Sequence, residues 1–109
     1  MAEAYKVLGQ AALAATTLTD VYTVPAATAA VISTIFMANR SALPVVVRLS
    51  VAVAGAGDAT KQYIYYDVPI PTNDSLAVTA GITLAATDVI RAYAASADIS
   101  VSVFGTEIT

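Results

Sequence analysis

The sequence predicts an all-β, single-domain antiparallel β-sandwich, jelly-roll-like, with about eight short strands. Three observations support this prediction. Apolar residues occur in runs of strand length rather than with a helical period, and β-branched residues recur throughout. Gly, Pro, Asn and Asp punctuate the chain about every eight to twelve residues. The 109 residues match the commonest domain size, so one domain over residues 1–109 is expected. An immunoglobulin-like sandwich is the second choice of architecture.

The first two predicted strands lie near the N-terminus. Residues 5–8 form a strand that is expected to end near Gly9. Residues 10–19 are rich in Ala and Thr without a helical stripe, so they predict a loop or irregular edge, with a short helix as the alternative. Residues 20–24 form a short strand that Pro25 closes, because proline cannot donate to a ladder.

Two longer strands follow. Residues 30–39 alternate with period two, but both resulting faces are largely apolar, so this strand is expected to be covered on both sides. The first predicted face holds Val31, Ser33, Ile35 and Met37, and the second holds Ile32, Thr34, Phe36 and Ala38. Residues 45–53 place a valine or leucine at every second position, which predicts a half-buried strand.

The C-terminal half continues the pattern. Residues 55–58 predict a turn, and the strand over residues 62–70 ends at a pair of prolines. A turn at residues 73–74 precedes a short strand at 75–79. Residues 82–88 are expected to connect to a strand at residues 89–94, and the last strand is expected at residues 99–108.

The chain is poor in charge. Only 12% of residues are charged and 58% are hydrophobic, whereas about 25% charged is usual. Such a domain is expected to rest part of its surface on other protein. Residues 21–39 are free of charge, but Pro25 and interspersed Thr and Ser argue against a membrane span. No signal peptide is expected, since the N-terminus lacks a basic segment followed by an apolar one.

Composition also argues against several kinds of chemistry. The chain contains no His and no Cys, so it offers no imidazole base and no thiolate metal ligand. Its acidic residues flank predicted strands, where Asp commonly bonds backbone N–H groups, and they lack the EF-hand spacing. Five scattered basic residues and a net charge of −3 disfavour a nucleic-acid surface. We therefore expect no enzyme, cofactor, metal or nucleic-acid partner.

Aromatic and basic residues within predicted strands are the candidate contact residues. Period two places Tyr63 and Tyr65 on one face and Tyr66 on the other. These rings are expected to pack at a subunit contact, with stacking on sugar as the alternative. Arg48 lies within a strand and is expected to face solvent or to pair with a carboxylate of a neighbouring subunit. The predicted interface residues are Tyr5, Arg48, Tyr63 and Tyr65.

Six segments together resemble small virion structural proteins of tailed bacteriophages. They are YKVLGQ (5–10), DVYTVPA (20–26), IFMANR (35–40), YIYYD (63–67), IPTNDS (70–75) and ITLAATDVIR (82–91). In the last segment Thr87 stands where such proteins usually have Gly, which is expected to alter only the geometry of a turn.

The resemblance implies a role in capsid decoration (cement) or as a tail or fibre accessory part, and it does not separate head from tail. Our leading expectation is a capsid decoration protein, a homotrimer that binds the major capsid protein or other virion proteins. It would be made in the host cytoplasm and located in the virion. A tail, baseplate or fibre component is the first alternative. A carbohydrate-binding β-sandwich module is the second.

Overall fold

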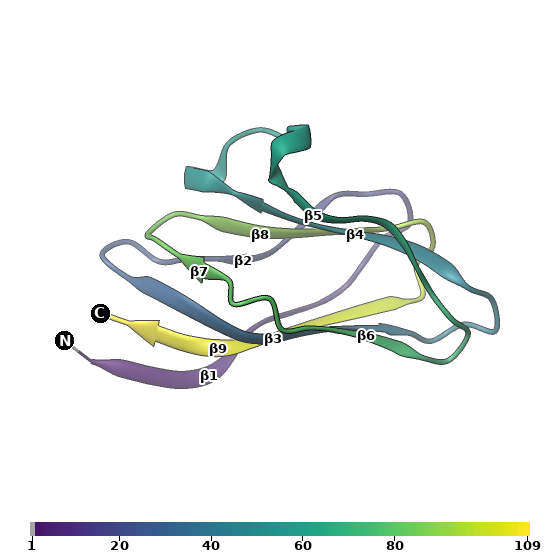
Figure 1. The fold of residues 1–109 in the computed structure, drawn as a ribbon, viewed down its shortest axis with the longest axis horizontal. Helices are drawn as coiled ribbons and strands as arrows, with labels where there is room; N and C mark the ends of the chain where they lie inside the picture. Colours follow the sequence, from purple (N-terminus) through teal and green to yellow (C-terminus); the bar gives the residue numbers. More distant parts are fainter. Residues whose placement is uncertain (1) are drawn as a thin grey trace.

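The computed structural model describes residues 2–109 as a two-layer β-sandwich (Figure 1). Sheet A has the strand order β1-β9-β3-β6, with the short β7 also paired to β3, and sheet B has the order β2-β8-β4-β5. The strands are β1 (Glu3–Ala12), β2 (Thr19–Thr23), β3 (Ala29–Asn39), β4 (Val45–Ala52), β5 (Tyr63–Ile70), β6 (Ser75–Val78), β7 (Thr83–Leu84), β8 (Val89–Ala94) and β9 (Ile99–Ile108). Every strand pair is antiparallel. The predicted all-β sandwich is confirmed.

The strand order is that of a jelly roll. The segments β6 and β7 both pair with β3, so together they act as one interrupted strand and bring the total to eight. The first and last strands, β1 and β9, are hydrogen-bonded neighbours. A constant-type immunoglobulin sandwich places its first and last strands in different sheets, so this alternative does not fit.

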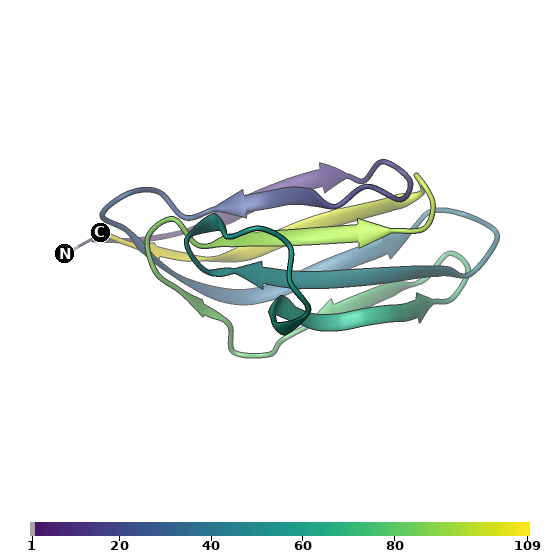
Figure 2. The ribbon, with the colours of Figure 1, turned by 90° about the horizontal axis from the view of Figure 1, so that it is seen from above.

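The strands run along the longest dimension of a body of 45 × 27 × 20 Å (Figure 2). The sheets stack along the 27 Å direction, and the four strands of sheet B lie side by side across the 20 Å direction (Figures 1 and 2). Both chain ends meet at one end of the body, where Ala2 and Thr109 exchange two backbone hydrogen bonds. Each sheet therefore presents one long outer face.

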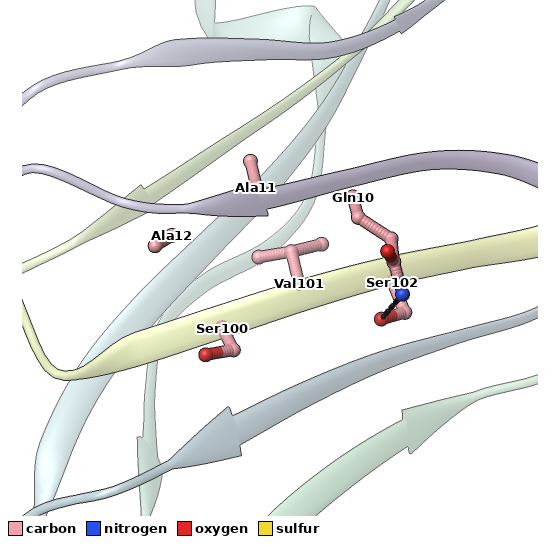
Figure 3. Close-up of a pocket in the computed structure, with 6 residues that line it drawn as sticks. All are labelled: Gln10, Ala11, Ala12, Ser100, Val101 and Ser102. Carbon is pink, nitrogen blue, oxygen red and sulfur yellow. Dashed lines mark hydrogen bonds between the residues drawn. The ribbon is translucent and has the colours of Figure 1, made fainter.

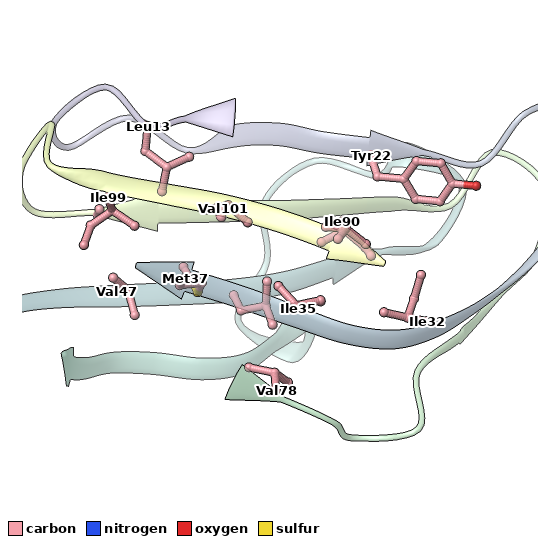
Figure 4. Close-up of a cluster of buried hydrophobic side chains, with 14 of the residues drawn as sticks. Leu13, Tyr22, Ile32, Ile35, Met37, Val47, Val78, Ile90, Ile99 and Val101 are labelled. Carbon is pink, nitrogen blue, oxygen red and sulfur yellow. The ribbon is translucent and has the colours of Figure 1, made fainter. Parts of the chain in front are cut away.

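The core fills the space between the sheets. Side chains such as Leu13, Ile35, Met37, Ile90 and Val101 are almost completely buried there (Figure 4). Sheet A and sheet B both contribute, because each strand turns alternate side chains inward. No helix within residues 2–109 has the length and apolar character needed to span a membrane.

Strand β1 is longer than predicted. It continues through Gly9 to Ala12 because its pairing with β9 continues to Ser100, so the predicted loop is wrong for residues 10–12. Gly9 lies at a register shift, and a Cβ atom there would collide with the carbonyl oxygen of Val21. This glycine permits close approach of β1 and β2 rather than ending a strand.

A β-bulge also changes the faces of β3. The register with β9 shifts between Ile32 and Thr34, so Ile32 and Ile35 are both buried. Val31 and Phe36 are each 42% exposed. The prediction that Val31 shares a face with Ile35 is wrong, because one extra residue reverses the alternation that follows it. Among residues 2–109, only the inner face of β3 is covered, so the prediction that β3 is covered on both sides does not hold for this part of the chain.

A polar clamp joins the two sheets. Glu107 of β9 lies 2.6 Å from the Lys6 ammonium of β1, and it accepts a hydrogen bond of 2.7 Å from the Tyr22 hydroxyl of β2. The bond to Lys6, and next the bond from Tyr22, lower the pKa of the Glu107 carboxyl. Burial and the bond to Glu107 raise the pKa of Tyr22.

The turn before β8 is held by Asp88. Its carboxylate accepts 2.9 Å hydrogen bonds from the backbone N–H groups of Ala54 and Ala85, as expected of Asp beside a strand. Thr87 has a φ of +68°, and the Asp88 N–H donates to the Ala85 carbonyl. A positive φ at the third turn position is typical of a type II turn, which favours Gly. Thr87 thus occupies a left-handed position that Gly would adopt more readily.

Candidate binding surfaces

The four predicted interface residues do not lie on one surface. Tyr5 is on the outer face of sheet A and is 79% exposed. Arg48 and Tyr63 are on the outer face of sheet B. Tyr65 packs against the core from the inner side of β5. The predicted shared face of Tyr63 and Tyr65 is therefore wrong.

Two register shifts between β4 and β5 explain the error. Leu49, on the inner face of β4, pairs with Tyr65, while Ser50, on the opposite face and itself fully buried, pairs with Tyr63. A second shift lies between Val47 and Leu49, and beside it Asp67 has a φ of +54°. Period two fails across each bulge, so Tyr63 and Tyr66 share the outer face instead.

The outer face of sheet B carries a compact set of side chains, which we call the Arg48 cluster. It consists of Arg48, Tyr63, Tyr66, Asp67 and Tyr93. The Arg48 guanidinium carbon lies 4.1 Å from the ring centre of Tyr66 and 4.4 Å from that of Tyr93. The Nε and Nη2 atoms of Arg48 donate to the two carboxylate oxygens of Asp67 at 2.7 and 3.4 Å. The rings of Tyr63 and Tyr66 meet edge to face at 5.0 Å.

Contacts within the Arg48 cluster and with Asp58 shift the pKa values of Arg48 and Tyr63. The hydrogen bond to Asp67 raises the pKa of Arg48. Burial and a 2.9 Å hydrogen bond to Asp58 raise the pKa of Tyr63. At neutral pH Arg48 therefore remains a guanidinium cation beside the Asp67 carboxylate, and Tyr63 remains an uncharged phenol.

Both strand arginines of sheet B find their partners within the chain. Arg48 pairs with Asp67, and Arg91 lies 2.8 Å from Asp20. Arg91 also donates to the carbonyls of Gly55 and Ala56, which ties the β4–β5 loop to β8. The carboxylate that sequence reasoning sought in a neighbouring subunit is thus present in the same chain.

The outer face of sheet A is almost free of charge and carries several exposed apolar side chains. Tyr5, Val7, Val31 and Phe36 are between 42% and 79% exposed, and the Phe36 and Phe104 rings meet edge to face at 6.1 Å. Strand register assigns only one charged side chain of the described chain to this face, that of Glu3, at the end near the termini. Glu3 accepts a hydrogen bond from the Tyr5 hydroxyl.

Two shallow hollows run along the seam between β1 and β9 on this face. One, of about 330 Å³, is lined by Gln10, Ala12, Ser100 and Ser102 among others, and a hydrogen bond joins Gln10 to Ser102 (Figure 3). The other, of about 410 Å³, lies between Val7 and Phe104. We call the outer face of sheet A, with these hollows, the apolar face.

Sequence reasoning missed Tyr93, Phe36 and Phe104 as surface residues. A usable signal existed for Tyr93, which lies two positions after Arg91 and so shares its face. No signal existed for Phe36, because its exposure depends on the bulge in β3. Within residues 2–109, no group of three or more His, Cys, Asp or Glu side chains is arranged to hold a metal ion.

Comparison with known proteins identifies no relative. No protein-family model, no curated protein and no solved structure matches this chain.

Proposed function

We propose that this protein is a non-enzymatic capsid decoration protein of a tailed bacteriophage, which docks on the shell through the apolar face. The observation that carries the proposal is the near absence of charge on that face, together with its exposed Tyr5, Val7, Val31 and Phe36. Exposed apolar side chains gathered on one face are typical of contact surfaces.

The size of the apolar face suits a specific protein contact. The whole body measures 45 × 27 × 20 Å, so the face on one sheet measures at most about 45 × 20 Å, which is comparable to the ~800 Å² that each partner buries in a standard interface. Binding there desolvates almost no ions, so the cost that charged groups impose on burial is small. The two hollows between β1 and β9 offer places for side chains of the shell protein.

The proposed mechanism is mechanical. Each copy contacts more than one molecule of the major capsid protein, so separating any one of them also breaks contacts to the decoration protein. A homotrimer on a threefold or quasi-threefold site multiplies these contacts, and linked contacts add avidity without requiring any single strong one. The site of action is the virion.

The test is co-sedimentation of the purified protein with empty shells of the phage that encodes it. We expect saturable binding and shells that withstand higher temperature. Phe36→Asp is expected to lose binding by about 100-fold or more, because a buried unpaired charge is strongly unfavourable. The matched control Tyr66→Asp, on sheet B, is expected to bind normally.

Three results would contradict the proposal. Shells that do not retain the protein would remove the decoration role, and unchanged binding of Phe36→Asp would remove the apolar face as the contact. Label located only at the tail of intact particles would instead support the alternative of a tail, baseplate or fibre component. Light scattering on the free protein tests the trimer separately.

A further inference from the structure

The Arg48 cluster offers a rigid polar surface that the proposed docking does not use. Arg48 is restrained on three sides, by the carboxylate of Asp67 and by the rings of Tyr66 and Tyr93. A free arginine side chain loses much rotamer freedom when it binds a ligand. Here that loss has already occurred in folding, so a ligand would meet a preorganised group.

The cluster keeps hydrogen-bonding capacity free. Arg48 uses Nε and Nη2 on Asp67, while its Nη1 donates to no group in the described part of the chain. Asp58 accepts the Tyr63 hydroxyl through Oδ1, which leaves its Oδ2. Tyr66 is 56% exposed, and its hydroxyl has no partner among residues 2–109. Donors and acceptors therefore lie side by side around exposed aromatic carbon.

The charged side chains of the Arg48 cluster and Asp58 favour an uncharged ligand over an ionic one. One cation, Arg48, stands against two carboxylates, Asp58 and Asp67, so the surface has a net charge of −1. An anionic ligand would be repelled overall, and a cation would meet Arg48. A sugar hydroxyl both donates and accepts, and the C–H groups of a sugar ring can pack on aromatic carbon.

We propose that the Arg48 cluster, with Asp58, is a binding site for neutral oligosaccharide. This site lies on sheet B, opposite the apolar face, so it would remain accessible on a protein docked through sheet A. The proposal goes beyond the decoration function and does not depend on it. Either can fail alone, since each is tested with a substitution on a different sheet.

The experiment is a titration of ¹⁵N-labelled protein with four neutral sugars: maltotriose, cellotriose, triacetylchitotriose and mannotriose. We expect saturable amide shifts around Arg48, Tyr63, Tyr66 and Tyr93 with at least one of them. Tyr66→Ala is expected to weaken that binding by about tenfold or more, which corresponds to the loss of one good aromatic contact. The matched control Tyr5→Ala removes an exposed tyrosine from the opposite sheet and is expected to bind normally.

Folding is checked on the same spectra, since dispersed peaks outside the cluster show that each variant retains the sandwich. Arg48→Lys keeps the charge but not the planar group stacked between two rings, and it is expected to weaken binding as well. Absence of saturable shifts with all four sugars up to about 10 mM, a range that reaches very weak affinities, would overturn the proposal. Shifts confined to sheet A, or equal binding by Tyr66→Ala, would overturn it too.

Discussion

The two outer faces of this sandwich differ in how their side chains are satisfied. On sheet B, Arg48 and Arg91 each have a carboxylate partner in the chain, and Tyr66 and Tyr93 flank Arg48. On sheet A, almost no outward side chain is charged, several exposed ones are apolar, and Phe36 has Phe104 as its aromatic neighbour. The first face is stabilised by contacts within the chain. The outer face of sheet A has few such contacts in the free protein, and its exposed apolar side chains would be buried by a partner.

Because of this difference, substitutions on the two faces are expected to affect different measured properties. Substitutions on sheet B remove contacts that already exist, so they are expected to lower the free energy of unfolding. Substitutions on the apolar face remove groups that water already reaches, so they are expected to affect association instead.

The largest effect is expected from two neighbouring residues on opposite sides of β3. Ile35 is fully buried and Phe36 is 42% exposed. Ile35→Ala is expected to lower the free energy of unfolding by about 2–5 kcal/mol, because it leaves a cavity. Phe36→Ala is expected to cost less than about 1 kcal/mol. Urea unfolding measures both, and equal losses would mean that the bulge in β3 does not place these side chains as described.

A smaller effect is expected within the Arg48 cluster. Tyr93→Ala removes one of the two rings that flank Arg48 and is expected to cost about 1–2 kcal/mol. Tyr5→Ala on the opposite sheet, at 79% exposure, is expected to stay within about 0.5 kcal/mol of the parent. If thermal unfolding showed Tyr5→Ala to be the costlier change, the two faces would not differ as proposed.

The clamp at Glu107 belongs to neither outer face and should respond to pH. Its folded pKa lies below the ordinary value of 4.5, so its contribution is present above that pH and is lost as the pH falls through the folded pKa. The stability difference between the parent and Glu107→Gln is therefore expected to shrink between about pH 6 and pH 3. Urea titrations at both pH values measure it. A difference that is constant with pH would exclude a role for the charge.

The smallest effect is expected at the turn before β8. Thr87 holds a φ of +68°, which costs a non-glycine residue about 1 kcal/mol or more. Thr87→Gly is expected to raise stability by up to about 1 kcal/mol, after the added freedom of Gly in the unfolded chain is deducted. Thr87→Ala keeps the steric cost and is the control. If Thr87→Ala were more stable than the parent and Thr87→Gly were not, the Thr87 side chain rather than its backbone conformation would be the source of the instability.

Sequence alone predicted the elements of this protein well. Strands at residues 20–24, 30–39, 45–53 and 89–94 all lie within one or two residues of β2, β3, β4 and β8. The jelly-roll choice came from the number and spacing of the strands, and the single domain from the length of the chain. These features can be predicted because their signals are local: the two-residue alternation of a strand and the residues of a turn both lie within a short stretch of sequence.

Tertiary structure decided which side chains reach the surface. Tyr63 and Tyr65 separate, and Tyr63 joins Tyr66, because a register shift with β4 lies between them. Val31 and Phe36 are exposed together for the same reason in β3. A bulge depends on how two strands pair, and one inserted residue reverses every face beyond it. The residue types of the candidate surfaces could be predicted from the sequence, but their grouping into two opposite faces required the paired strands.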